Sequence, residues 1–235
     1  MKKKKLIFSV FLVMIFILSL NYFIKEETNI IYTPQKVIDD EKYNYTEEKE
    51  SDNKTNNEKD ETDSDIIGKI TIDGTNINYE IVQGSDNEFF LNHSVTKEEN
   101  IHGSVFMDYR NTLDDRKLLI YGHNSKTLKD ALFHDLEKYL KKSFYEEHKY
   151  IDITLNNKKS TWEIISVMIV EENNNSHMKI TFNDEEFIKH IDWMKEESLY
   201  NTNIEVGNTD KIITLQTCYY NPKNSYLIVN AKKVK

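Results

Sequence analysis

The chain of 235 residues contains one cysteine, Cys218, with only 6 glycines and 2 prolines. A single cysteine excludes an intrachain disulfide, so the fold depends on a hydrophobic core, which a chain of this length is able to build. The scarcity of glycine and proline excludes collagen-like and proline-rich classes. Cys218 is then either a small buried hydrophobic residue or a reactive nucleophile, and its sequence context must decide between the two.

The sequence also lacks an excess of positive charge. Its formal net charge is −9, whereas nucleic-acid binding needs a basic face that displaces counterions. We therefore expect no nucleic-acid partner. The negative charge is concentrated in residues 25–65, which hold 14 acidic and 6 basic side chains. The most acidic stretch is thus not the part of the chain that has the pattern of a folded domain.

The N-terminal part of the chain has the pattern of a membrane anchor. Residues 6–24 carry no formal charge and follow a basic tail at residues 1–5. A helix over this span would measure about 29 Å, close to the hydrocarbon core of a bilayer, and the lysines favour a cytoplasmic N-terminus. We expect a single-pass signal anchor in the cell membrane, with a cleaved signal peptide as the alternative. Residues 25–65 are expected to form an acidic flexible stalk, and residues 66–235 a folded extracellular domain.

The segment from residue 66 onward predicts a mainly β fold. Its short apolar segments are rich in Ile, Val, Tyr and Thr, and several alternate as half-buried strands do. Helical spacing appears over about Leu128–Phe144 and about Asp184–Glu197, the second with a capping box at Asn183 and Glu186. Eight strands with two or three peripheral helices favour a closed barrel, which leaves no exposed sheet edge. The expected strands lie at residues 66–72, 76–82, 104–108, 117–121, 150–155, 160–170, 211–217 and 225–232.

Two groups capable of covalent chemistry stand at the ends of expected strands. Cys218 directly follows the seventh strand, and His123 lies just past the fourth. If those strand ends are neighbours, the imidazole is able to take the proton of the thiol and later protonate a leaving amine. The sequence contains neither an HExxH nor a CxxC motif, so we expect no metal site.

The stretches around these positions resemble one enzyme family. Thr214–Cys218 reads TLQTC and resembles the TLxTC signature of sortases, while Ile120–His123 resembles the segment that carries the histidine of that family. Ser104–Asn111 and Tyr139–Lys149 are similar to stretches typical of class B sortases. Several such stretches in the correct order make chance similarity improbable.

The resemblance covers the chain from about Asp65 to Val234 and implies an eight-stranded sortase barrel on the outer face of a Gram-positive membrane. It implies a cysteine transpeptidase, a thiol protease of the hydrolase class, in which Cys218 attacks a threonine carbonyl in the C-terminal sorting motif of a secreted protein. An amine from a peptidoglycan precursor then resolves the thioacyl enzyme, which anchors the surface protein to the cell wall. His123 is implied as the general acid and base, with no metal or organic cofactor. We also expect three neighbours to contact the substrate: Thr217, Leu215 and Asn124.

The sequence departs from the family pattern at the third catalytic position. The family has an arginine on the strand after the cysteine, but here that position is Tyr226, and no arginine follows Arg116. An arginine presents a charged fork of donors, whereas tyrosine donates one neutral hydrogen bond. Three explanations stay open. Tyr226 acts together with a backbone N–H, or Lys223 or Arg110 reaches the site, or the protein is a weak or inactive homologue that binds sorting peptides.

A Cys–His hydrolase of another fold is a further alternative. Papain-like peptidases place the cysteine at the start of a helix and usually before the histidine in the chain. Here His123 precedes Cys218, and the cysteine follows a strand. This order disfavours the papain-like fold.

Overall fold

The computed structural model describes residues 65–127 and 131–235. The expected basic tail and signal anchor, and the stalk up to residue 64, lie outside these residues. The described residues belong to one compact unit. Within the described residues, no helix has the length and apolar character needed to cross a membrane.

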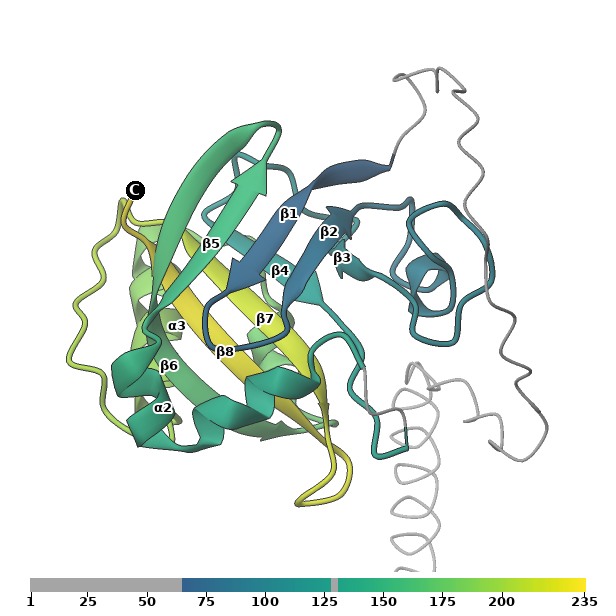
Figure 1. Ribbon diagram of the computed structural model, residues 1–235. Coiled ribbons are helices and arrows are strands. Elements are labelled where there is room, and N and C mark those ends of the chain that lie inside the picture. Colours follow the sequence, from purple (N-terminus) through teal and green to yellow (C-terminus); the bar gives the residue numbers. More distant parts are fainter. Residues whose placement is uncertain (1–64, 128–130) are drawn as a thin grey trace, which may run out of the picture. The chain divides into compact units, whose positions relative to one another are not determined.

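Eight strands close into a barrel in the order β1-β2-β3-β4-β7-β8-β6-β5 (Figure 1). The pairs β2/β3 and β4/β7 are parallel, and the other neighbours are antiparallel. The mainly β, eight-stranded barrel expected from the sequence is therefore confirmed. The strands are β1 (Ile66–Ile72), β2 (Asn78–Val82), β3 (Val105–Met107), β4 (Lys117–Tyr121), β5 (Tyr150–Leu155), β6 (Lys158–Glu171), β7 (Ile212–Tyr219) and β8 (Ser225–Lys233).

The helices are short and lie in the connections between strands. The 13-residue helix α3 (Asp184–Glu196) begins with the capping box expected from Asn183 and Glu186, which is present in both directions. The remaining helices are the 3₁₀ helices η3 (Phe89–Leu91), η4 (His134–Leu140) and η5 (Ser176–Met178), and the short α2 (Lys142–Glu147).

The single helix expected over Leu128–Phe144 is wrong in its described part. The chain forms η4, becomes extended at Lys141 with φ −100° and ψ 119°, and then starts α2. Phe133, Leu136 and Tyr139 are fully buried in the barrel core. These residues are three apart, and the tighter 3₁₀ turn of three residues places all of them on one side. Tertiary packing therefore selects the 3₁₀ form over the α-helix that the apolar spacing suggested.

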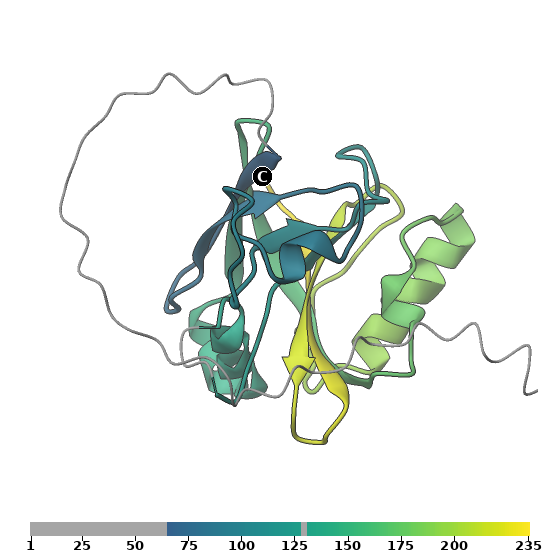
Figure 2. The same cartoon turned by 90° about the vertical axis from the view of Figure 1, so that its right-hand side faces the viewer.

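Strand β7 is covered on both faces, and this determines where its side chains point. Ile213 and Leu215 belong to the cluster that fills the barrel interior. Ile212 points the other way and packs in a second cluster with Phe187 and Met194 of α3. Figure 2 shows α3 beside the yellow strands β7 and β8. Because side chains alternate along a strand, every second residue from Ile212 onward lies on the outer face, beneath the connection between β6 and β7.

Candidate active site

Cys218 and His123 lie at the same end of adjacent strands. Cys218 is the penultimate residue of β7 and does not follow the strand as expected, whereas His123 lies two residues past the end of β4. Strands β4 and β7 run parallel with Tyr121 paired to Gln216, so that His123 and Cys218 each lie two residues further along. Neighbouring strands are about 4.8 Å apart. Both residues also lie on the outer face, because Leu118 and Ile120 of β4 point into the barrel interior, as Leu215 of β7 does. The fold thus brings the two groups to one rim.

Hydrogen bonds continue from the β4–β7 ladder up to these two residues. The N–H of Gly122 donates to the carbonyl of Gln216 (3.2 Å), and the hydroxyl of Thr217 donates to the carbonyl of Gly122 (2.7 Å). A Cβ on Gly122 would lie 2.6 Å from the ring of Phe133, so the position requires glycine. The N–H of Phe133 in turn donates to the carbonyl of His123 (2.8 Å). The backbone on either side of the imidazole is therefore fixed.

The imidazole of His123 is held from one side by the loop between β2 and β3. Its Nε2 lies 2.5 Å from the carbonyl oxygen of Leu91 in η3. Because a carbonyl only accepts, Nε2 carries the proton in this contact, and the neutral ring presents Nδ1 as its basic nitrogen. Burial lowers the pKa of His123 and the Leu91 bond opposes that effect. The ring is therefore favoured in its neutral form, ready to accept a proton.

The thiol of Cys218 is also favoured in its neutral form. Cys218 is a free, half-buried cysteine. Burial raises its pKa, and the carboxylate of Glu172 raises it further. Glu172 lies two residues past Val170, which pairs with Tyr226, and its N–H donates to the carbonyl of Asn224 (3.0 Å). The pKa shifts of Cys218 and His123 thus both favour the neutral form of the side chain.

Tyr226 lies directly across the sheet from Cys218. The two residues are paired in the antiparallel register of β7 and β8 and therefore share the outer face. The half-buried ring of Tyr226 lies 5.7 Å, centroid to centroid, from the ring of His177 in η5. His177 is fully buried, and its Nε2 lies 2.9 Å from Oε1 of Gln216, two residues before Cys218. Tyr226, at the position where the family has an arginine, is thus the cross-strand neighbour of Cys218 and contacts the ring of His177.

The two cations considered as replacements for that arginine differ in position. Arg110 forms a bidentate contact with Asp108, with both distances 2.8 Å, and also donates to the carbonyl of Met178 (3.2 Å). Its charge is paired with the carboxylate of Asp108, a residue whose N–H donates to the carbonyl of Leu119 (2.9 Å), four residues before His123. Lys223 is exposed on the turn between β7 and β8. Of the two, only Lys223 lies on a segment that joins the rim.

The residues expected to contact substrate lie deeper than the sequence suggested. Leu215 is fully buried in the barrel interior, so no peptide reaches its side chain. Thr217 is 2% exposed and uses its hydroxyl to bond Gly122. Asn124 is 3% exposed, and its amide is bonded within the protein. The side chains of all three residues are therefore used in contacts within the protein near the ends of β4 and β7.

Several residues that shape this rim carry no signal in the sequence. Leu91 offers only its backbone carbonyl, which no side-chain pattern reveals. His177 and Glu172 lie in the connection after β6, where no periodicity fixes their direction. Their contacts depend on how that connection folds back over β7.

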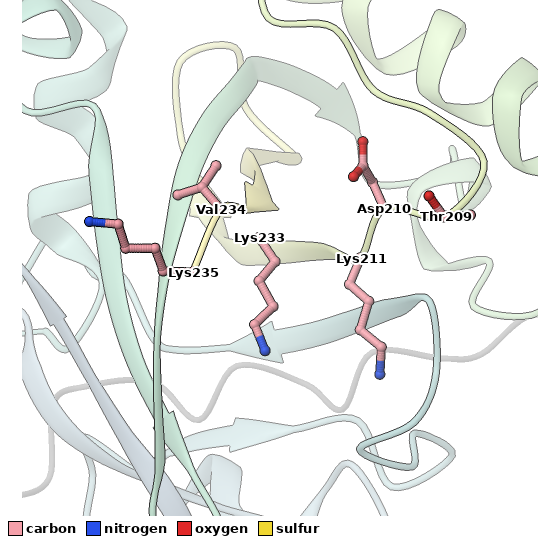
Figure 3. A pocket seen from close by; sticks show the side chains of 6 residues that line it. All are labelled: Thr209, Asp210, Lys211, Lys233, Val234 and Lys235. Carbon is pink, nitrogen blue, oxygen red and sulfur yellow. The ribbon is translucent and has the colours of Figure 1, made fainter.

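The surface hollow drawn in Figure 3 lies away from this rim. It has a volume of about 280 Å³ and is lined by Thr209, Asp210, Lys211, Lys233, Val234 and Lys235. These residues lie at the start of β7 and the end of β8, whereas Cys218 is near the other end of β7. Among the described residues, no group of three His, Cys, Asp or Glu side chains is arranged to hold a metal ion.

Comparison with known proteins gives a consistent result. The sequence model of the sortase domain matches residues 70–234. Sortase B of Staphylococcus aureus (strain NCTC 8325 / PS 47) is 34% identical over 176 residues, which cover 73% of this chain and 71% of that protein. Sortase B of Listeria monocytogenes serovar 1/2a (strain ATCC BAA-679 / EGD-e) is 33% identical over 194 residues, covering 78% and 77%.

Solved structures of sortase B have a similar fold. The X-ray structure of Clostridium perfringens sortase B has a TM-score of 0.70 and 34% identity, covering 74% of this chain and 96% of that one. A complex of Staphylococcus aureus sortase B with substrate has a TM-score of 0.68 and 34% identity, covering 74% and 81%. A sortase B complexed with triglycine has a TM-score of 0.67 and 33% identity, covering 74% and 82%.

Proposed function

This chain belongs to the sortase family, with sortase B proteins as its relatives, and we propose that it cleaves the C-terminal sorting motif of secreted proteins at threonine and joins the new acyl end to an amine of the cell-wall peptidoglycan. Sortase transpeptidase activity follows from the family. The sorting motif, the wall amine and the roles of individual residues are the proposal. The observation that carries it is the parallel β4–β7 pairing, which delivers Cys218 and His123 to one end of one face.

The first half-reaction forms a thioester. The sulfur of Cys218 attacks the threonine carbonyl carbon, and the thiol proton passes to Nδ1 of His123. The tetrahedral intermediate carries its negative charge on the former carbonyl oxygen. As the C–N bond breaks, the imidazolium returns that proton to the leaving amine. A neutral resting pair suits this sequence, because each partner starts in the protonation state that it needs.

The second half-reaction releases the enzyme. The amine of the acceptor attacks the thioester carbonyl and gives up a proton to His123. The C–S bond then breaks, and the proton returns to the sulfur of Cys218. An amide bond is formed for each one broken, so the exchange needs no external energy source or cofactor. In one known complex a sortase B holds a substrate and in another triglycine, which supports a peptide donor and a glycine amine as probes for this chain.

We assign Tyr226 as a donor to the oxyanion, because it lies across from Cys218 in the position of the family arginine. Its hydroxyl offers one hydrogen bond without charge. A missing oxyanion donor typically reduces turnover by about 10²–10³-fold. We therefore expect this chain to turn over more slowly than a sortase that has the arginine.

The N-terminal part of the chain completes the proposal. A signal anchor at residues 6–24 and a stalk at residues 25–65 would hold the body, residues 66–235, at the outer membrane surface. Exported substrates and lipid-linked wall precursors meet there, and a tether raises the effective concentration of the enzyme toward both.

A peptide library tests the function directly. The full chain in detergent is incubated with fluorogenic peptides that contain a threonine in varied sorting motifs, with and without triglycine. We expect cleavage, a covalent adduct on Cys218 detectable by mass spectrometry, and a new peptide bond to triglycine. The Cys218→Ala variant should lose all three. Cleavage that persists in this variant would show that another group performs the chemistry.

A binding module without turnover is the second candidate, and the tyrosine at position 226 favours it. It predicts that sorting peptides bind while no adduct forms. Formation of a covalent thioacyl adduct between Cys218 and a sorting peptide would contradict it, because a module that only binds does not form that bond.

A further inference from the structure

The residue after His123 has its side chain buried between the two strand ends. Asn124 is 3% exposed. Its Nδ2 donates to the carbonyl oxygen of Cys218 (3.0 Å) and to Oε1 of Glu137 (2.6 Å). Its Oδ1 lies 2.9 Å from Nδ1 of His134. Both amide hydrogens and the amide oxygen are therefore used inside the protein, which leaves this side chain little capacity to bind a substrate.

The bond from Asn124 to Cys218 continues the hydrogen bonds of the β4–β7 ladder. It joins the residue after His123 to Cys218 itself. The ladder ends with bonds between Gly122 and Gln216 and between Thr217 and Gly122. The next bond joins Asn124 to the carbonyl of Cys218. The backbone carbonyl of Asn124 also accepts a bond from the hydroxyl of Tyr220 (2.9 Å). The peptide units that carry the imidazole and the sulfur are thus linked from both sides.

The far end of this link is anchored in η4. Glu137 and His134 lie on the 3₁₀ helix whose apolar residues are packed into the barrel core. A contact of 2.6 Å to a carboxylate has the length of a charge-assisted hydrogen bond. Asparagine suits the position because it supplies two donors and one acceptor from one planar group. Aspartate lacks the donors, and leucine lacks all three groups.

We propose that Asn124 is a positioning residue that fixes the distance and direction between the thiol of Cys218 and the imidazole of His123. It acts through these residues and touches no substrate, and the inference rests on the proposed function. This role explains why a polar side chain with no access to peptide is buried at the rim. It also makes η4 part of the machinery that aligns the reacting groups.

The test compares two buried asparagines. Asn124→Leu removes the link without adding charge and with little change in size. Asn111→Leu is the matched control. Asn111 is 4% exposed and also bonds a carboxylate and a backbone carbonyl, those of Asp115 and Lys117, but lies away from the rim. Both variants lose comparable hydrogen bonds, so a general loss of stability affects both.

Two readouts on the full chain in detergent separate alignment from folding and from substrate binding. With a cleavable sorting peptide, we expect Asn124→Leu to lower kcat by about 10²-fold, a typical effect of small misplacement, with KM within about twofold. We also expect Cys218 alkylation to be slower at neutral pH, because the imidazole no longer meets the thiol proton. Asn111→Leu should leave both close to wild type.

Glu137 supplies a variant that leaves Asn124 in place. Glu137→Ala removes the anchor, whereas Glu137→Gln keeps an oxygen that accepts the same bond. We expect the alanine variant to lose part of kcat and the glutamine variant to recover it. If Asn124→Leu does not fold, the comparison of Glu137→Ala with Glu137→Gln tests the inference in its place.

Three results would overturn the inference. An increase in KM with unchanged kcat would make Asn124 a substrate contact. Equal losses in Asn111→Leu would mean general loosening of the fold. If kcat and the rate of Cys218 alkylation are both unchanged in Asn124→Leu, Asn124 has no positioning role. Alkylation needs no substrate, so this readout still tests Asn124 if the wild-type chain turns out to have no transpeptidase activity.

Discussion

The sulfur of Cys218 lies among groups that oppose its ionisation. Burial acts first, and the carboxylate of Glu172 adds to it. The resulting high pKa keeps the thiol protonated until a substrate and His123 are aligned. An enzyme with one unprotected cysteine gains from this, because a neutral thiol reacts slowly with oxidants and disulfides. Reactivity then depends on alignment within the site.

Replacing Glu172 should raise the reactivity of the thiol. In Glu172→Gln the negative charge is gone, so the pKa of Cys218 falls and alkylation at neutral pH should accelerate, by about two- to threefold because the exposed carboxylate is screened by solvent. Rates of alkylation by iodoacetamide measured against pH check this. Glu171→Gln is the control. Glu171 precedes Glu172, its side chain projects from the opposite face of β6, and its replacement should not change the alkylation rate. Equal rates in wild type and Glu172→Gln would contradict the assignment.

The hydroxyl and the ring of Tyr226 have different assigned roles, which one substitution is able to separate. Tyr226→Phe keeps the ring against His177 and removes the hydroxyl that we assign to the oxyanion. We expect kcat to fall by about 10²-fold, with KM little changed, as measured with the same fluorogenic peptide. Tyr219→Phe is the control, because Tyr219 packs toward the barrel interior. Wild-type turnover in Tyr226→Phe would leave the oxyanion to a backbone N–H or to Lys223.

The connection between β6 and β7 is fixed to the sheet by a buried lysine amino group. Lys117 of β4 is fully buried. Its Nζ bonds the carbonyls of His177 and Lys179 (3.0 Å for the second) and lies 3.0 Å from Nε2 of His190 on α3. Burial, with the charge of Arg110, lowers the pKa of Lys117 to about 7. One side chain thus joins β4, η5 and α3, and it holds the segment that brings His177 against Tyr226.

Removing this amino group should loosen the connection between β6 and β7. Lys117→Met keeps the length of the side chain but leaves two buried carbonyls without a donor, at a cost of about 1–3 kcal/mol each. We expect faster amide hydrogen exchange at residues 176–180, measured by mass spectrometry. Exchange in β1 and β5, on the far side of the barrel, is the internal control. Uniform acceleration would indicate global destabilisation, and no change would show that the carbonyls have other donors.

The sequence located the elements but did not determine the packing between them. The GH dipeptide follows β4 as expected, because turn residues and β-branched runs mark strands locally. The TLQTC stretch lies inside β7, which continues to Tyr219 and is longer than expected. The faces of β7 were not readable, since both are covered and Leu215 and Ile212 are equally apolar. The partners of Asn124 lie 13 and 94 positions away in the chain. Such contacts depend on the closed barrel and leave no local pattern.

At the scale of the whole molecule, three buried basic side chains lie close together between the barrel and the β6–β7 connection. They are Lys117, His177 and His190. Burial, with the neighbouring charge of Lys117, lowers the pKa of His177 to about 4 and that of His190 to about 3. The unfolded chain takes up protons on these rings near pH 6.5, whereas the folded chain resists them. The stability that the neutral rings provide is therefore complete above about pH 6.5 and is lost as the pH falls toward 4.

Acid should therefore destabilise the fold within a defined window. We expect the melting temperature to fall between pH 6.5 and 4, with His177 alone accounting for on the order of 3 kcal/mol at pH 4. His190→Phe removes one of the two rings and should flatten the pH dependence in this window. Thermal melts from pH 8 to 4 of wild type and variant decide this. Parallel curves would show that His190 does not contribute to the acid response.

The parallel pairing of β4 with β7 also dictates when the reacting groups meet during folding. Residues 122–211, which include β5, β6 and α3, separate these two strands in the chain. Closing a loop of this length has a high entropic cost and is slow. A chain that is still emerging from its ribosome has the imidazole before it has the thiol, because His123 precedes Cys218. The proposed catalytic pair therefore comes together only once β7 has paired with β4, so an unfolded chain has both groups but no active site.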